Sequence, residues 1–228
     1  MDTLVICLSL GTLVGCIWLY LFKERLRLSL WLIPIISVLN TVAGLICVKF
    51  FAGIENWGSP ISSGQSLFGG VLLLPLIYII SAKVFRCKLC DVFDILAMCT
   101  ITTLLFARIA CILGGCCYGT FIPGSESIRW PTRELEIIFY IILLIVLYRK
   151  NRRNSLPGEI WPIYMISYGI FRFIEEWLRE GEQVLGPFHY GHIWAILSVA
   201  IGISIYGELR NQNEKKKGKI QKKGVRQW

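Results

Sequence analysis

The sequence predicts an all-α membrane protein with seven transmembrane helices, its N-terminus outside the cell and its C-terminus in the cytoplasm. The 228 residues are 55% hydrophobic and 17% charged, whereas a soluble domain carries about 25% charged residues. Long apolar segments recur along the chain, and basic residues gather in every second connection between them. Composition and charge pattern therefore exclude a soluble globular domain.

Seven segments approach the roughly 20 apolar residues that a helix needs to cross a bilayer. The fifth and the seventh are short, so their ends are the least defined. The first lacks the basic leader of a secretory signal and carries Asp2 instead, so we expect a retained helix. In chain order, the expected spans are 3–22, 30–51, 67–84, 92–113, 135–148, 160–178 and 191–206.

Lysine and arginine residues cluster after every odd-numbered span, and the loops after the even-numbered spans are nearly free of them, Arg129, Arg133 and Arg179 apart. The positive-inside rule then places the connections after odd spans in the cytoplasm. We expect one transmembrane domain, residues 1–207, and a basic cytoplasmic tail, residues 208–228. The tail has eight Lys/Arg and two acidic residues, which suits a solvated segment near anionic lipids rather than a nucleic-acid-binding one.

Two arginines lie inside expected spans. Arg108 lies ~24 Å along the fourth span and Arg172 ~18 Å along the sixth, at 1.5 Å per residue. A buried guanidinium in a membrane needs a counter-charge that lipid tails cannot supply. Because both arginines fall in the outer half of the bilayer, we expect them to form one site.

Arg172 and Glu176 are four residues apart and share one helix face. One interpretation is a structural ion pair that neutralises itself. Since a single glutamate cannot neutralise Arg108 as well, the other interpretation is that both guanidiniums bind an anionic phosphate. Arg179, one turn further out, either joins this site or extends its head group to the interface.

Five motifs lie in or beside the chain's expected spans, and two of them contain the arginines. They are Arg108 with Gly114-Gly115…Gly119, Tyr168-Gly169…Arg172…Glu176…Arg179, Phe68-Gly69-Gly70, Pro131-Thr132…Glu136, and Gly191-His192…Leu197-Ser198. Together they resemble the motifs of prolipoprotein diacylglyceryl transferases, a family of all-helical enzymes of the bacterial inner membrane. The resemblance covers nearly all of the chain except the tail and depends mainly on the two arginine-bearing motifs.

The resemblance implies an enzyme that transfers diacylglycerol from phosphatidylglycerol to the lipobox cysteine of an exported prolipoprotein. Arg108 matches the family's essential arginine, and Arg172 and Glu176 match its Arg–Glu pair. The partners implied are phosphatidylglycerol or a related anionic phospholipid, the exported protein and the membrane, with no cofactor and no nucleic acid. The positions expected to contact substrate are Gly69, Gly70, Gly115, Gly119, Tyr168 and Arg179.

The chain departs from the family pattern at three positions. Phe68 stands where the family has a histidine proposed as general base, and Cys111 and Cys116 stand where it has Asn and Glu. Two alternatives to the family's reaction remain open. One is a related transferase with another lipid or acceptor, and the other is a non-catalytic phospholipid-binding or transport protein.

Cysteine and histidine residues are the remaining candidates for chemistry. Cys116 and Cys117 lie at the oxidising outer face beside Arg108, where a thiol could act as nucleophile or acyl carrier, or the pair could form a disulfide. Alternatively, Cys111 and Cys116 simply fill the volume of the missing Asn and Glu. His189 and His192 could replace the missing base or simply lie at the interface. The Cys87…Cys90 pair lacks two further ligands, so we expect no metal.

Overall fold

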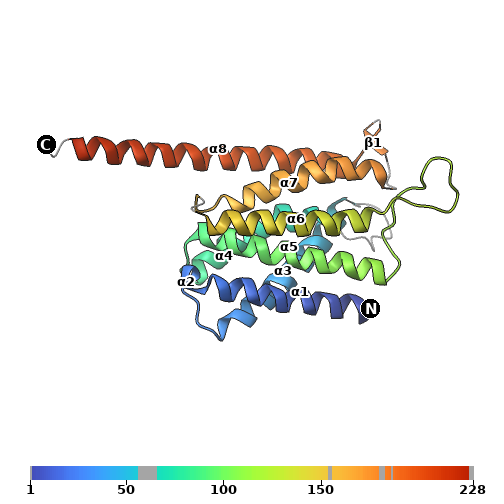
Figure 1. The fold of residues 1–228 in the computed structure, drawn as a ribbon, viewed down its shortest axis with the longest axis horizontal. Coiled ribbons are helices and arrows are strands. Elements are labelled where there is room, and N and C mark those ends of the chain that lie inside the picture. Colours follow the sequence, from blue (N-terminus) through green and yellow to red (C-terminus); the bar gives the residue numbers. More distant parts are fainter. Residues whose placement is uncertain (1, 56–65, 154–155, 180–182, 186, 226–228) are drawn as a thin grey trace.

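The computed structural model describes residues 2–55, 66–153, 156–179, 183–185 and 187–225 as a bundle of helices (Figure 1). Seven of its helices have 16 or more residues, and each overlaps one of the seven expected segments. They are α1 (Asp2–Leu21), α3 (Leu32–Glu55), α4 (Phe68–Val84), α5 (Leu89–Leu113), α6 (Thr132–Arg152), α7 (Ile160–Glu175) and α8 (Tyr190–Val225).

The helical architecture is confirmed, and four short elements accompany the seven long helices. A short helix, α2 (Lys23–Leu26), follows α1, and a 3-10 turn, η1 (Glu176–Leu178), ends α7. Two short antiparallel strands, β1 (Gln183–Leu185) and β2 (Phe188–His189), precede α8. Four helices, α1, α3, α5 and α8, are long and apolar enough to cross a membrane, and α4 is a shorter apolar helix.

Several helices extend beyond the apolar segments that predicted them. Helix α8 continues to Val225, so the part of the basic tail that the structure describes is helical and projects past the bundle (Figure 1). Helix α6 begins at Thr132 and ends at Arg152, several residues outside the expected span on either side. Polar residues continue the backbone hydrogen bonding of a helix after its apolar stretch ends, so hydropathy alone underestimates helix length.

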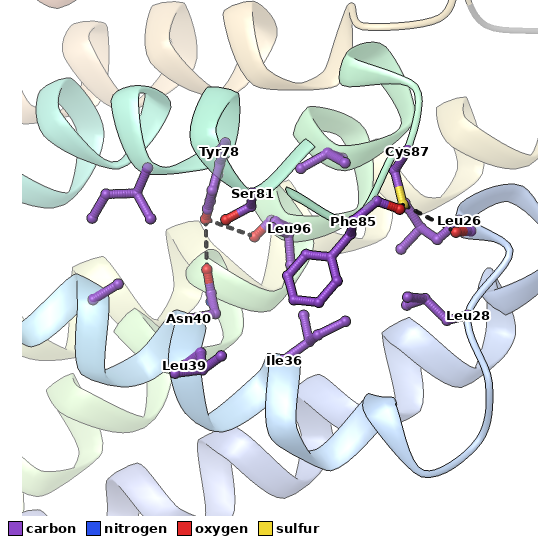
Figure 2. Close-up of a pocket in the computed structure, with 13 residues that line it drawn as sticks. Leu26, Leu28, Ile36, Leu39, Asn40, Tyr78, Ser81, Phe85, Cys87 and Leu96 are labelled. Atoms are coloured by element: carbon purple, nitrogen blue, oxygen red, sulfur yellow. Dashed lines mark hydrogen bonds between the residues drawn. The ribbon is translucent and has the colours of Figure 1, made fainter. Parts of the chain in front are cut away.

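Side-chain hydrogen bonds between polar groups join the helices inside the bundle. Tyr78 of α4 donates to Asn40 of α3 at 2.8 Å and lies 2.6 Å from the Thr100 hydroxyl of α5. Trp18 of α1 donates to Thr102 of α5 at 2.9 Å. Such bonds stabilise helix contacts where no water is available to hydrogen-bond. Asn40 and Tyr78 also line an apolar pocket between α3, α4 and α5 (Figure 2).

A buried polar network holds together the end of the bundle that contains α2. The Arg25 guanidinium donates to Asp91 at 2.6 Å, to Asp94 at 3.2 Å and to Asn151 at 2.5 Å. Asp94 also accepts the backbone N–H groups of Gly158 and Ile160, at 2.9 and 3.0 Å. The fully buried Asp94 carboxylate thus connects α2 and α5 to the N-terminus of α7, where negative charge is favourable.

Replacement of Asp94 with Asn should lower the free energy of unfolding by about 2–3 kcal/mol, because the amide keeps the shape but loses charged hydrogen bonds. Denaturation of the full chain in mild detergent would measure the change. Glu24→Gln is the matched control, since Glu24 is exposed on α2 and should leave stability nearly unchanged. Equal effects of the two substitutions would contradict a structural role for this network.

Candidate active site

The end of α5, the start of α6 and the end of α7 lie at the end of the bundle that holds the N-terminus (Figure 1). Four charged side chains from these segments contact one another. Glu136, in the second turn of α6, is fully buried and accepts a hydrogen bond from Arg108 Nε of α5 at 2.5 Å. The Nη1 atoms of Arg172 and Arg179 lie 3.5 and 3.3 Å from the other oxygen of the Glu136 carboxylate. One carboxylate is therefore shared by three guanidiniums, and Arg108 and Arg172 lie in one cluster.

Two more glutamates complete this arginine–glutamate cluster. Glu175 pairs with Arg172 and its Oε1 lies 3.6 Å from Arg179 Nη1, while Glu176 Oε2 lies 2.8 Å from Arg172 Nη2. With Glu136, three carboxylates face three guanidiniums. The sequence suggested Glu176 as the only counter-charge for the arginines, which would leave a surplus of positive charge. That expectation is wrong, because the three arginines and three glutamates of the cluster balance when all six groups are ionised.

The orientation of Arg179 is also settled by these contacts. Its side chain is 18% exposed and turns towards Glu136 and Glu175, so the alternative in which it extends to the interface is wrong. Glu136 was not identified as an ion partner from the sequence. The sequence did show that Glu136 is an acidic residue inside an expected apolar span. A carboxylate there needs a partner of opposite charge, for the same reason as a buried arginine.

Donor groups without a protein partner lie along α7 beside the cluster. Tyr168 is fully buried, four residues before Arg172, and therefore on the same helix face. Neither Tyr168 Oη nor Arg172 Nε has a hydrogen-bond partner among the described residues. Buried donors left unpaired cost about 1–3 kcal/mol each, so a polar ligand that accepts from them is favoured.

The two histidines occupy different environments. His192 is fully buried, and its ring packs edgewise against Phe173, Trp177 and Phe188. Its Nδ1 accepts the backbone N–H of His189 at 3.1 Å, so this nitrogen is occupied by a structural hydrogen bond. His192 is thereby held in place by its surroundings.

His189 faces the arginine–glutamate cluster instead. Its side chain is 15% exposed, and Nδ1 lies 4.0 Å from Glu176 Oε1. A Cβ atom at Gly191 would lie 2.3 Å from the Glu176 carboxyl carbon, so glycine is required for this carboxylate to approach the start of α8. The positive end of α8 then adds to the favourable surroundings of Glu176.

The glycines expected to contact substrate have clear packing roles. A Cβ at Gly69 would lie 2.2 Å from the Cys47 carbonyl oxygen, so Gly69 allows α3 and α4 to approach closely. A Cβ at Gly119 would lie 2.6 Å from the Leu178 carbonyl oxygen, where the loop after α5 meets η1. Gly115 has φ +62°, a left-handed conformation that suits glycine. Contact of these residues with substrate remains a prediction.

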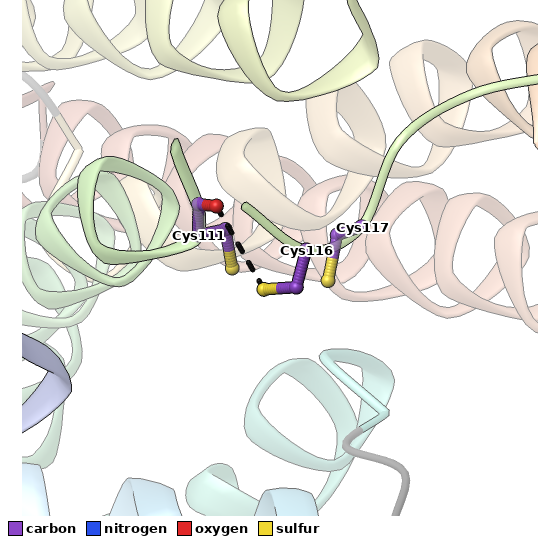
Figure 3. A group of neighbouring side chains, drawn as sticks. All are labelled: Cys111, Cys116 and Cys117. Carbon is purple, nitrogen blue, oxygen red and sulfur yellow. Dashed lines mark hydrogen bonds between the residues drawn. The ribbon is translucent and has the colours of Figure 1, made fainter. Parts of the chain in front are cut away.

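The loop after α5 brings three cysteines together (Figure 3). The sulfur atoms of Cys111, Cys116 and Cys117 all lie within 4.8 Å of one another and are thiols rather than disulfides. The Cys111 thiol, hydrogen-bonded to Cys117, and the nearby Arg108 guanidinium lower the pKa of the Cys117 thiol to about 5, against the effect of burial. Cys116 is exposed, so its thiol can be reached from outside the bundle. A direct chemical role for these cysteines stays a prediction.

A second apolar pocket lies close to Arg108. It lies between α1, α3, α4 and α5, and its lining includes Gly70, Leu74, Leu104 and Ala107, the residue before Arg108. Asn40 lines both this pocket and the one in Figure 2. The pocket thus reaches the residue of α5 that precedes Arg108 in the sequence.

Comparison with known proteins assigns the fold to a family. The model of the prolipoprotein diacylglyceryl transferase family matches residues 6–207, which include every residue of the arginine–glutamate cluster. The chain belongs to this family.

Relatives in this family share modest sequence identity with the chain. The phosphatidylglycerol–prolipoprotein diacylglyceryl transferase of Campylobacter hominis is 28% identical over 68% of this chain and 60% of the relative. The enzyme of the same name from Chlorobaculum tepidum is 25% identical over 76% of this chain and 65% of the relative. The corresponding transferase 2 of Clostridium perfringens is 23% identical over 80% of each protein. The match thus spans less than two thirds of the first two relatives.

The shared role of Glu136 predicts strong coupling between charge-removing substitutions. Arg108→Gln and Glu136→Gln should each lower the free energy of unfolding by about 3–5 kcal/mol, because each leaves an unbalanced buried charge. The double substitution restores neutrality and should cost clearly less than the sum. Detergent denaturation would measure all three variants, with exposed Glu126→Gln as the control. Additive effects would show that the two groups do not form a pair.

Proposed function

We propose that this protein transfers a diacylglyceryl group from phosphatidylglycerol to the cysteine thiol of an exported prolipoprotein. The observation that carries the proposal is the convergence of three arginines on Glu136 at one end of an apolar bundle. Membership of the transferase family and the names of its relatives support the reaction.

We further propose that all seven long helices cross the bacterial cytoplasmic membrane, with the N-terminus outside. The basic clusters on α2, after α4 and at the end of α6 lie at one end of the bundle, opposite the arginine–glutamate cluster. The positive-inside rule assigns that end to the cytoplasm. Residues 1–207 then form the transmembrane domain, and the basic segment from residue 208 onward extends into the cytoplasm.

The reaction breaks the bond between a glycerol carbon of the diacylglyceryl group and a phosphate oxygen, and forms a carbon–sulfur bond. The thiol proton leaves to a base, and the departing glycerol phosphate gains negative charge as the bond breaks. Guanidiniums fixed beside that phosphate stabilise the developing charge. Arg108 and Arg172 are the groups proposed for this task, and Arg179 lies within the same cluster.

The protein already holds the donors that a phosphate would need. Arg172 Nε and Tyr168 Oη have no partner among the described residues. Glu136 keeps the guanidiniums of Arg108 and Arg172 close to each other before substrate arrives. Preorganised donors of this kind need little rearrangement when charge develops. The acyl chains would occupy the apolar pocket that ends beside Arg108 at Ala107.

We propose His189 as the base that accepts the thiol proton. Its Nδ1 lies 4.0 Å from Glu176 Oε1, and a carboxylate at this position stabilises the imidazolium formed on proton transfer. His192 is the less suitable candidate because its Nδ1 is occupied and its ring is enclosed by aromatic side chains. This assignment would replace the family histidine whose position Phe68 takes.

The rival function is a protein that binds phospholipid without consuming it. The polar residues replaced by Phe68, Cys111 and Cys116 favour this alternative. It shares the phosphate site and the apolar pocket with the transferase, so lipid binding alone cannot separate the two. Product formation is the measurement that distinguishes them.

Reporter fusions test the proposed topology. An alkaline phosphatase reporter should be active after Ser125, in the loop between α5 and α6, and inactive after Asn151, at the end of α6, since only the exterior supports its folding. A cytoplasmic reporter should show the opposite pattern. Reversed activities at both positions would overturn the placement of the arginine–glutamate cluster in the outer half of the membrane.

Mass spectrometry tests the reaction. Purified protein in phosphatidylglycerol vesicles, incubated with a lipobox peptide, should produce a diacylglyceryl adduct on the peptide cysteine and release glycerol phosphate. Vesicles of phosphatidylcholine and a peptide with serine in place of the cysteine are the controls. Lipid binding without any adduct would support the rival function, and lipid consumption without peptide modification would indicate another acceptor.

Two substitutions test the site in the same assay. Arg108→Lys keeps the charge but loses the bidentate hydrogen bonding of a guanidinium to a phosphate, so we expect turnover to fall by at least about 100-fold. His189→Gln should reduce turnover by roughly 100-fold with less effect on lipid binding. Arg153→Lys, on an exposed arginine at the opposite end, is the control. Near-normal turnover of Arg108→Lys in folded protein would reject phosphate gripping by this residue.

A further inference from the structure

The three cysteines at the end of α5 have no part in the proposed transfer reaction. Cys111 belongs to the last turn of the helix, and Cys116 and Cys117 follow the Gly114-Gly115 turn. Figure 3 shows the three side chains side by side, and their sulfur atoms lie within 4.8 Å of one another. In the part of the chain that the structure describes, this is a group of three thiols with no fourth metal-ligating side chain.

The start of α6 holds the backbone of these cysteines in place. Arg133 Nη1 donates to the carbonyl oxygens of Cys111 and Cys116, at 3.3 and 3.2 Å. The Thr132 hydroxyl donates to the carbonyl oxygen of Cys117 at 3.3 Å. All three cysteine carbonyls are therefore bound by neighbouring side chains, which leaves the thiols as the groups available to a ligand.

The Arg133 contact is itself rigid. Its guanidinium stacks 3.8 Å from the centroid of the Tyr118 ring, and the side chain is only 9% exposed. Cys117 adopts a left-handed conformation, with φ +60°. This conformation is unfavourable for a residue other than glycine and persists only where the surroundings impose it. The loop is thus fixed in the shape that gathers the thiols.

We propose that Cys111, Cys116 and Cys117 form a binding site for a soft d10 metal ion, Cu(I) or Zn(II), with three thiolate ligands. Metal–sulfur bonds of 2.3 Å in a trigonal arrangement separate the sulfurs by about 4 Å, close to the spacing that the thiols already have. Thiolate ligands select such metals over Mg²⁺ or Ca²⁺. Binding replaces three S–H bonds with metal–sulfur bonds and releases three protons to solvent.

The surroundings favour the negative charge of the resulting complex. Three thiolates carry net charge −2 with Cu(I) and −1 with Zn(II), and Arg108 Nη1 lies 4.0 Å from Cys111 Sγ. Zinc in structural sites takes four ligands, whereas the group here has three. We therefore expect Cu(I) to bind more tightly than Zn(II). The proposed topology places the site at the outer face, from which the ion would arrive.

Metal titration of the reduced full chain in phospholipid nanodiscs tests the site. Cu(I) competed against bicinchoninate, and Zn(II) competed against a chromophoric chelator, give stoichiometry and affinity for each ion. The expected result is one ion per chain, with three sulfur neighbours at about 2.3 Å by X-ray absorption. Tighter binding of Zn(II) than Cu(I) would keep the thiolate site and overturn the preference for copper.

Single substitutions identify the ligands. Cys111→Ser, Cys116→Ser and Cys117→Ser should each weaken metal binding by at least about 100-fold. Loss of a residue that only hydrogen-bonds to a ligand normally weakens metal binding by less than this. Arg133→Gln should weaken it by about 10–100-fold, because the ligand backbone loses its anchor. Cys99→Ser, at a buried thiol inside the bundle, is the control. Thermal denaturation of each variant separates metal loss from unfolding.

Three outcomes would overturn the proposal. The first is binding that does not saturate at one ion per chain, and the second is equal affinity of the parent and the three ligand variants. The third is a disulfide among these cysteines that persists in reductant and prevents metal binding. Metal binding is measured without a peptide acceptor and without following lipid consumption. Failure of the metal-site proposal therefore leaves the transferase proposal untouched, and failure of the transferase proposal leaves the metal-site proposal untouched.

Discussion

Buried arginines in an apolar bundle have to be neutralised within the protein, and this requirement organises the end of the molecule that carries the candidate active site. Arg108, Arg172 and Arg179 form ion pairs with Glu136, Glu175 and Glu176. In the proposed reaction, a substrate phosphate would have to compete with these carboxylates for the guanidinium donors. Affinity for lipid would then depend on how readily Glu136 shares those donors, and on the additional donors Tyr168 Oη and Arg172 Nε.

The same constraint links the reactive groups to the fold. Glu136 connects α6 to α5 and α7, and the loop after α5 is bound to η1 through the Leu178 carbonyl oxygen, which accepts the Thr120 N–H at 2.8 Å. At the opposite end, Asp94 connects α5 to α7 and to Arg25. Helix α5 is therefore fixed by charged contacts at both ends, and the position of Arg108 depends on both.

Hydropathy predicted the seven helices because each carries a long apolar segment, and the arginines were found because a charge inside such a segment is conspicuous. The ends of the helices could not be predicted, since α6 and α8 continue through polar residues. The partners of the arginines were only partly predicted. Glu136 is about 30 residues from Arg108 in the sequence, and only the packing of α5 against α6 reveals that the two form a pair.

The cysteine cluster shows the same limit of sequence reasoning. The spacing of residues 111, 116 and 117 does not predict that their sulfurs converge, because convergence depends on the left-handed turn at Gly115 and on the anchoring of two carbonyls by Arg133. By the resemblance to the transferase family, Cys116 stands where the family has a glutamate and Cys111 where it has an asparagine. The two substitutions that remove these polar groups would then also supply two of the three thiols of the proposed metal site, next to Arg108, whose Nη1 lies 4.0 Å from Cys111 Sγ.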